Sequence, residues 1–239
     1  MLSTSDTKTC LSITPDQILY EDSYLIAVNK PAGLPTQPTL DKKRQNLFDA
    51  VKSFFTLRDN PEDAYLGMPH RLDVETSGVV LFTKSREVNP AMAQAFSKRL
   101  IQKKYIALIE HPADFTIPEY WEIKNYLGRD KTSKKIDRFV AVRSGGKCAR
   151  TEFKLLKSFA HTALIEATPH TGRTHQIRAH LSGYQTPILG DTFYGATHTA
   201  PRVMLHALNL RFLHPANTAE ICIEAPVPRD FKAVLLSLS

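Results

Sequence analysis

A dense run of ionisable and turn-forming residues stands directly before an apolar stretch of the chain. The run reads His70-Arg71-Leu72-Asp73-Val74-Glu75-Thr76-Ser77-Gly78, and the apolar stretch begins at Val79. Loops in this position commonly hold active sites, because the strand that follows positions the side chains that the loop displays. Taken alone, however, the run fits a polar turn capped by Asp73 better than it fits an active site.

A second polar segment, Thr168–Arg178, crowds two arginines and two histidines around Gly172 and the expected start of a helix. Helix starts present free amide donors and the positive end of the helix dipole to anions. The segment therefore fits phosphate or carboxylate binding. It fits a solvated basic turn equally well.

The elements that would position these two segments show both strand and helix patterns. Short apolar runs and alternating apolar residues predict strands around Leu25–Val28, Gly78–Thr83, Tyr105–Ile109 and Thr151–Leu155. Apolar residues at a helical period predict helices over Asn46–Phe55, Pro90–Arg99 and Thr174–Tyr184. Strands mixed with scattered helices favour an α+β fold around a large mixed sheet.

The second and third predicted helices each have an apolar face, and two polar regions are expected outside the regular elements. In the second helix the apolar face is Met92, Phe96 and Leu100; in the third it is Ile177 and Leu181, with His175 and Arg178 on another flank. Residues 1–15 are rich in Ser and Thr and predict a loose arm, followed by a single domain over residues 16–239. The charged segment Gly128–Lys147 predicts a solvated loop or hairpin.

The overall charge narrows the class of partner. The chain has 31 Lys and Arg against 24 Asp and Glu, a net charge of +7 and a pI near 9.3. This balance favours a polyanionic partner, because counterion release strengthens phosphate contacts, although a solubilising basic surface explains it as well.

Three widely spaced cysteines predict neither a disulfide framework nor a zinc site. We expect a cytoplasmic monomer, since no signal peptide, membrane span or heptad repeat is visible.

Two superficial matches are set aside. His70-Arg-Leu-Asp73 and the region of Lys30 share letters with protein-kinase elements, but no glycine-rich loop precedes Lys30 and no Asp-Phe-Gly follows Asp73. His170, His175 and His180 recur every fifth residue, which places them about 140° apart around a helix. Such spacing prevents a shared metal-binding face.

Five segments of the chain form an ordered set. They are Val28-Asn-Lys-Pro-x-Gly33, His70-Arg-Leu-Asp-x-x-Thr-Ser-Gly78, Lys104-Tyr-Ile-Ala107, Thr171-Gly-Arg-Thr-His-Gln-Ile-Arg-x-His-Leu181 with Pro187-Ile-Leu-Gly-Asp-x-x-Tyr-Gly195, and Leu205-His-Ala207 with His214-Pro215. Together they resemble the motifs of the RluA family of RNA pseudouridine synthases, over roughly residues 17–231. One departure is Gln185-Thr186, where the family usually has Gly-His.

This resemblance implies a fold and a reaction. The fold would be a large mixed, mostly antiparallel sheet flanked by helices, with a central RNA-binding cleft. The reaction would isomerise uridines in structured RNA to pseudouridine, by breaking the bond between N1 and C1′ and rejoining the base through C5. An isomerisation of this kind needs no redox cofactor, nucleotide or metal. Asp73 would act at the ribose, either attacking C1′ or removing a C2′ proton, and the sequence leaves both open.

The resemblance also assigns roles to neighbouring residues. Arg178 would pair with Asp73, because its planar fork can hold a carboxylate bidentately. The target uridine must leave its stack, so Arg71 would fill the gap and Tyr105 would lie against the extruded uracil, its hydroxyl a candidate for relaying the C5 proton. Ordinary readings are a phosphate contact for Arg178 and a half-buried strand residue for Tyr105.

His70, Arg173 and His175 are expected to contact RNA or support the site, and Lys30 is expected to contact RNA. A separate N-terminal RNA-binding domain, which some family members carry, does not fit before the first motif, so the catalytic domain itself would select the RNA. A non-catalytic RNA chaperone on the same fold is the alternative, although a purely binding descendant need not retain Asp73, Tyr105 and Arg178. A nuclease or phosphotransferase lacks clustered carboxylates for magnesium. Whether tRNA or ribosomal RNA is the substrate is open.

Overall fold

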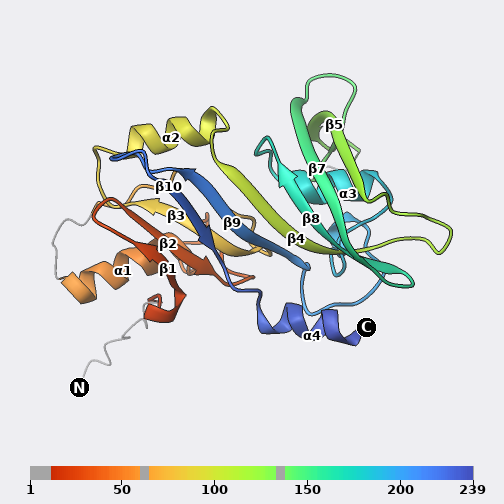
Figure 1. Cartoon of the computed structure of the whole chain (residues 1–239), viewed down its shortest axis with the longest axis horizontal. Helices are drawn as coiled ribbons and strands as arrows, with labels where there is room; N and C mark the ends of the chain where they lie inside the picture. The colour runs from red at the N-terminus through yellow and green to blue at the C-terminus, as the bar shows by residue number, and fades with distance from the viewer. Residues whose placement is uncertain (1–11, 60–64, 133–137, 239) are drawn as a thin grey trace, which may run out of the picture.

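The fold is built on one mixed β-sheet (Figure 1). A computed structural model of the chain describes residues 12–59, 65–132 and 138–238. Within them the strands are β1 (Ile18–Glu21), β2 (Leu25–Lys30), β3 (Ser77–Thr83), β4 (Gln102–Glu110), β5 (Tyr120–Arg129), β6 (Phe139–Ala141), β7 (Lys147–Ser158), β8 (Thr162–Pro169), β9 (Leu205–Leu213) and β10 (Glu220–Glu224). The helices are α1 (Leu47–Asp59), α2 (Asn89–Ser97), α3 (Gln176–Gly183) and α4 (Arg229–Ser237), with short 3-10 turns η1 (Pro15–Gln17) and η2 (Thr192–Tyr194).

The strand order is β1-β2-β3-β9-β4-β8-β7-β5-β6, and β10 pairs with β9. Among the described strands, β3 and β9 run parallel and the other paired neighbours run antiparallel. The predicted α+β class with a mixed, mostly antiparallel sheet is therefore confirmed. The four predicted strands all exist. The first of them continues through Asn29 and Lys30, because Lys30 still pairs with Gly78 of β3.

The predicted helices are present with shifted ends. Asn46 caps α1 by accepting the amide of Asp49 at 3.0 Å, and Pro90 lies in the first turn of α2, where its missing N–H costs nothing. The prediction for Leu100 was wrong: α2 ends at Ser97, the chain turns at Arg99 with φ 63°, and Leu100 is 66% exposed. Helix α3 begins at Gln176, because His175 adopts a left-handed conformation.

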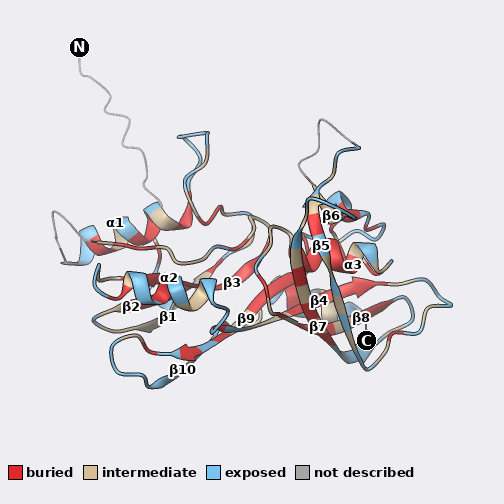
Figure 2. Cartoon of the chain, turned by 90° about the horizontal axis from the view of Figure 1, so that it is seen from above, coloured by how far each residue is buried: buried red, intermediate tan, exposed pale blue. Residues whose placement is uncertain are grey.

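The two larger hydrophobic cores lie side by side along the sheet. The first core, which includes Leu81, Val51 and Met92, packs α1 and α2 against β1–β3 and one end of β9. The second core, which includes Leu108 and Ile165, packs α3 and α4 against β4, β7 and β8. Buried residues follow β3, β9 and β4 through the middle of the molecule, where the two cores meet (Figure 2).

The charged segment Gly128–Lys147 is in part a hairpin. Strand β6 pairs with the end of β5, from Leu127↔Ala141 to Arg129↔Phe139, and residues 133–137 lie outside the described part of the chain. Of the arm proposed over residues 1–15, only residues 12–15 are described, and there Ile13 is buried in the first core. Within the described ranges, no helix has both the length and the apolar character needed to cross a bilayer.

Candidate active site

A cavity of about 490 Å³ opens where the two cores meet. Its walls come from the loop before β3, from the end of α2 and the start of β4, and from the segment leading into α3. All but one of the predicted site residues line it: His70, Arg71, Asp73, Tyr105, Arg173, His175 and Arg178. Segments that are distant in the sequence are therefore brought to one place.

The loop that carries Asp73 is held through its backbone. The Thr36 hydroxyl donates to the Leu72 carbonyl at 2.8 Å and accepts the Leu72 amide at 3.1 Å, while the Gly33 amide donates to the Val74 carbonyl at 2.7 Å. At the end of the loop, a Cβ on Gly78 would meet the Ala207 carbonyl oxygen at 2.2 Å, so only glycine allows β3 to approach β9. Asp73 thus projects from a loop with little freedom to move, and its side chain is 26% exposed.

Lys30 is the exception among the predicted RNA contacts. Its residue is 0% exposed, and Nζ donates to the carbonyls of Pro31 at 2.9 Å, Leu34 at 2.8 Å and Val74 at 3.1 Å. Burial lowers the pKa of Lys30, while the charges of Asp73 and Glu75 act in the opposite direction. The prediction that Lys30 contacts RNA was wrong, because the buried group ties the first motif to the Asp73 loop instead.

His70 supports the same loop. Its Nε2 accepts the Leu81 amide at 2.9 Å, because the pairing of β3 with β9 ends at Gly78 and leaves this amide without a partner strand. The His70 ring stacks on Phe96, with 4.4 Å between the ring centres. Burial lowers the pKa of His70 to about 3, so the imidazole is neutral. Arg71, next in the chain, is exposed at the cavity and remains available to RNA.

Arg178 is held by a carboxylate other than the expected one. Its Nε and Nη2 donate to Asp191 at 2.6 and 2.8 Å, and the Asp191 side chain is 0% exposed. The remaining Nη1 lies 3.8 Å from Asp73 and 3.7 Å from Glu75. The predicted bidentate grip on Asp73 was therefore wrong: the fork holds Asp191, and Asp73 receives one longer-range contact.

Opposing effects act on the pKa of the Arg178 guanidinium. Burial by itself lowers the pKa of Arg178, but the hydrogen bonds and charge of Asp191, with the charges of Asp73 and Glu75, raise it above its ordinary value. The guanidinium stays charged and lies over the ring of Tyr194, 5.0 Å from the ring centre. A fixed cation therefore faces the Asp73 carboxylate across the cavity.

Tyr105 joins the two cores. Its ring packs against both, on β4, beside a register shift between Lys104 and Tyr105 in the pairing with β9. Burial raises the pKa of its phenol, and the nearby charge of Asp73 raises it further. At neutral pH the hydroxyl therefore keeps its proton and can donate it in a hydrogen bond.

His175 and Arg173 complete the opposite wall. His175 has φ 54°, and its Nδ1 lies 3.1 Å from the hydroxyl of Tyr194. Burial lowers the pKa of His175, whereas the Asp73 charge raises it. Arg173 donates from Nε to the Cys148 carbonyl at 3.0 Å, which leaves its two terminal nitrogens for other contacts.

Comparisons with known proteins identify the family of the chain. The family model described as RNA pseudouridylate synthase matches residues 24–183. The ribosomal large subunit pseudouridine synthase C of Vibrio vulnificus is 33% identical over 231 residues, which cover 93% of this chain and 69% of that protein. This chain belongs to the RluA family of RNA pseudouridine synthases. Its enzymatic class is that of an isomerase acting on RNA.

Two further relatives support the family and the fold. The RNA pseudouridine synthase YhcT of Bacillus subtilis is 34% identical over 218 residues, which cover 90% of this chain and 70% of that protein. The solved structure of human RNA Pseudouridylate Synthase Domain Containing 4 superposes with a TM-score of 0.76 at 26% identity and covers 93% of each chain. The pseudouridine synthase fold expected from the motifs is confirmed.

Several residues that line or support the cavity were not predicted from the sequence. Asp191 lies inside the third motif, yet nothing in its neighbourhood indicates that it would hold Arg178, thirteen residues earlier. Glu75 lies two residues after Asp73, so the same loop could have suggested it. Arg99 and Lys103 line the cavity from either side of the α2–β4 turn, and burial, with the charge of Arg99, lowers the pKa of Lys103. A search for basic residues beside Tyr105 would have found Lys103.

Proposed function

We propose that this enzyme converts uridines of structured RNA, either tRNA or ribosomal RNA, to pseudouridine, with Asp73 acting at the ribose of a flipped-out nucleotide. The observation that carries the proposal is the convergence of Asp73, Tyr105 and Arg178 on one cavity of about 490 Å³. That volume is in the usual range for a site that encloses a small ligand, and a single nucleoside fits within it. A duplex does not fit, so the uridine would enter alone.

Asp73 and Arg178 would divide the work at the ribose. Asp73 must be ionised, whether it attacks C1′ or removes a C2′ proton. The guanidinium of Arg178, with its nearest nitrogen 3.8 Å away, contacts this carboxylate without engaging both of its oxygens. Because Asp191 already fills the fork of Arg178, an oxygen of Asp73 stays free to reach the sugar.

Tyr105 would contact the extruded uracil, and Arg71 would fill the space that the uridine leaves in the RNA. The Tyr105 ring, fixed by both cores, offers a face against which an extruded uracil can stack. Its protonated hydroxyl can take part in a proton relay at C5. Arg71 is exposed two residues before Asp73, where its long side chain can occupy the space that the uridine leaves in the RNA.

The rim of the cavity is basic. Arg71, Arg99, Lys103 and Arg173 surround the carboxylate, which suits the phosphates on either side of the target nucleotide.

The test is chemical mapping of pseudouridine in total tRNA and in unmodified ribosomal RNA, incubated without added metal. Wild-type protein is compared with Asp73→Asn, whose RNA binding and thermal unfolding are measured in parallel. We expect new pseudouridines with the wild type only, at positions that name the substrate. Absence of new sites on every RNA, with RNA binding intact, would contradict the proposal and favour the RNA chaperone.

A further inference from the structure

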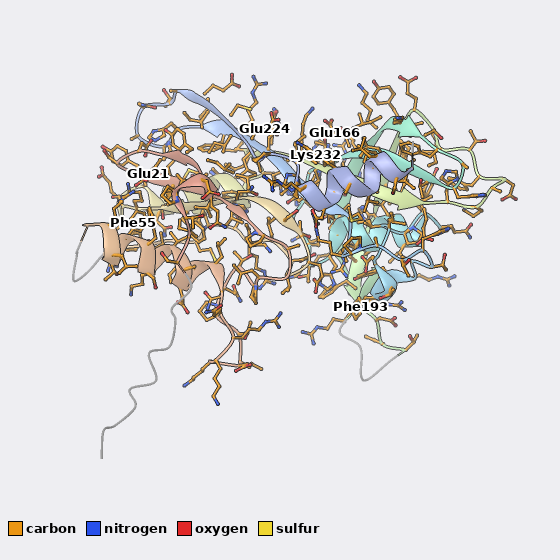
Figure 3. The ribbon with its side chains drawn as sticks, turned by 90° about the horizontal axis from the view of Figure 1, so that it is seen from below. Glu21, Phe55, Glu166, Phe193, Glu224 and Lys232 are labelled. Atoms are coloured by element: carbon orange, nitrogen blue, oxygen red, sulfur yellow. The ribbon has the colours of Figure 1, made fainter. Side chains whose placement is uncertain are left out.

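Phe193 is an exposed aromatic residue beside the catalytic cavity. It lies in η2, and 40% of its surface is accessible to solvent, whereas Tyr194, next in the chain, is buried. Figure 3 places Phe193 near the lower edge of the molecule, the side on which the loop before α1 also projects, and that loop carries the exposed residues Lys42, Lys43 and Arg44. The open ring therefore lies on a face that also bears positive charge.

The Phe193 ring is braced by the residues that build the site. It makes edge-on contacts with His175, at 6.0 Å and 87° between ring planes, and with Tyr194, at 5.3 Å and 68°. The guanidinium of Arg178 lies 5.8 Å from its centre. Tyr194 is itself fixed, because its hydroxyl accepts the Phe139 amide and donates to the Phe139 carbonyl, each at 3.1 Å. An exposed ring held this firmly loses little entropy when a flat ligand stacks on it.

A single exposed aromatic residue is common on protein surfaces and calls for no ligand by itself. Phe193 differs because two of its neighbours, His175 and Arg178, line the cavity that receives the uridine. Phe193 is not among the residues that line that cavity, so its exposed surface lies beside the cavity and is left uncovered when a uracil occupies it. If the substrate is RNA, the flat group that can reach a ring beside the cavity is the base of a nucleotide next to the target uridine.

We propose that Phe193 is a nucleobase-binding platform, on which an unpaired base flanking the target uridine stacks. This inference rests on the proposed function, because it takes the cavity to hold the uridine. Every base presents a π-face, so the platform would tolerate different bases while requiring that one be unstacked from its own helix. The enzyme would thereby favour uridines in loops or bulges over uridines inside a continuous duplex.

The first experiment compares Phe193→Leu, which keeps an apolar side chain but removes the ring, with Phe193→Trp, which keeps a ring. The substrate is an RNA fragment that the pseudouridine mapping identifies. Removing one stacked base should raise KM by about 5- to 150-fold in Phe193→Leu, with kcat nearly unchanged, whereas Phe193→Trp should remain close to wild type. The matched control is Tyr120→Leu, because Tyr120 is 61% exposed on β5 but lies about 23 Å along that strand from Leu127, which packs beside Tyr194.

A second experiment detects stacking without turnover. Phe193→Trp is titrated at low salt with a uridine octamer and with an abasic ribose-phosphate chain of equal length, after subtraction of the wild-type signal from Trp121. We expect quenching of the new tryptophan by the octamer and little by the abasic chain, with no such difference in Tyr120→Trp. Equal responses to the two chains would overturn the platform.

The outcomes separate this inference from the proposed function. If wild-type protein modifies no RNA, the proposed function fails. If the wild type is active and Phe193→Leu leaves KM unchanged, the platform fails alone. A fall in kcat at constant KM would also overturn it, because Phe193 would then act only by shielding Arg178.

Discussion

The two sides of the cavity hold their chemical groups by different means. On the side of the first core, Asp73 stands on a loop fastened by hydrogen bonds that involve main-chain atoms of Gly33, Leu72 and Val74. On the side of the second core, Arg178 stands on a helix and is fastened by one buried ion pair with Asp191. Several hydrogen bonds therefore fix the Asp73 loop, whereas Arg178 depends on the single side chain of Asp191.

This difference determines which substitutions should displace Asp73 and which should displace Arg178. Main-chain groups survive most side-chain substitutions, so the Asp73 loop should be weakened mainly by loss of Lys30, which binds three carbonyls, or of Thr36, whose hydroxyl binds both main-chain groups of Leu72. A buried ion pair fails when either partner is changed, because the other is left as an uncompensated charge. Substitutions that break the two sides separately should therefore differ in size and in what they do to catalysis.

The largest effect is expected for Asp191→Asn. Loss of the carboxylate leaves Arg178 buried without its bidentate partner, which should lower the free energy of unfolding by about 3–5 kcal/mol. The freed guanidinium should turn toward Asp73 and Glu75 and occupy the oxygens that reach the ribose. We expect kcat to fall by roughly a hundredfold with RNA affinity nearly unchanged, measured by single-turnover pseudouridine formation.

Asp230→Asn is the matched control for this prediction. Asp230 also grips an arginine through two nitrogens, Nε and Nη2 of Arg202, at 2.6 and 3.2 Å, but its side chain is 41% exposed. Because solvent screens the exposed Asp230 carboxylate, we expect the substitution to cost about 1 kcal/mol and to leave catalysis unaffected. Equal losses in the two variants would show that burial does not set the importance of the Asp191 pair.

Lys30→Met tests the other side. The substitution leaves the carbonyls of Pro31, Leu34 and Val74 without the donor that they share, so we expect a loss of about 2–3 kcal/mol in urea unfolding. Lys84→Met is the control, since Lys84 also donates to a carbonyl, that of Asp22 at 2.7 Å, but is partly exposed. If Lys30→Met were as stable as Lys84→Met, the Asp73 loop would not depend on the buried amine.

Acid should weaken both sides through buried histidines. His206 on β9, 2.9 Å from the Ser77 hydroxyl, and His180 on α3, 3.0 Å from the Thr151 hydroxyl, are both buried. Burial lowers the pKa of each to about 4. Because the unfolded chain binds these protons near pH 6.5 and the folded protein does not, stability is lost as pH falls from about 6.5 towards 4.

At pH 5 each histidine should account for a loss of roughly 2 kcal/mol relative to pH 7.5. Urea unfolding of the wild type, His180→Gln and His206→Gln at the two pH values measures each share. A pH dependence that is the same in all three proteins would mean that neither imidazole is kept neutral by the fold.

The sequence alone predicted the α+β class, four of the described strands and the helices α1, α2 and α3, because these follow from local periodicity and from contiguous motifs, but it did not predict α4. It did not predict how the side chains are paired. The partner of Arg178 depends on how α3 packs against η2. The burial of Lys30 depends on the approach of the loop that contains Val74, which is 44 residues further along the chain. Leu100 fits the helical period, but a left-handed turn at Arg99 ends the pattern before it.

The smallest effect is expected for Glu75→Gln. Glu75 competes with Asp73 for Nη1 of Arg178, at 3.7 against 3.8 Å, and its side chain is 46% exposed, so the contact is worth at most about 1 kcal/mol. Removing its charge should leave kcat within about threefold of wild type and tighten RNA binding about two- to fivefold at low salt, because one carboxylate fewer faces the phosphates. The gain should vanish at high salt in a filter-binding series. A large loss of kcat would instead make Glu75 a participant in the chemistry, and the first side of the cavity would then supply two reacting carboxylates rather than one.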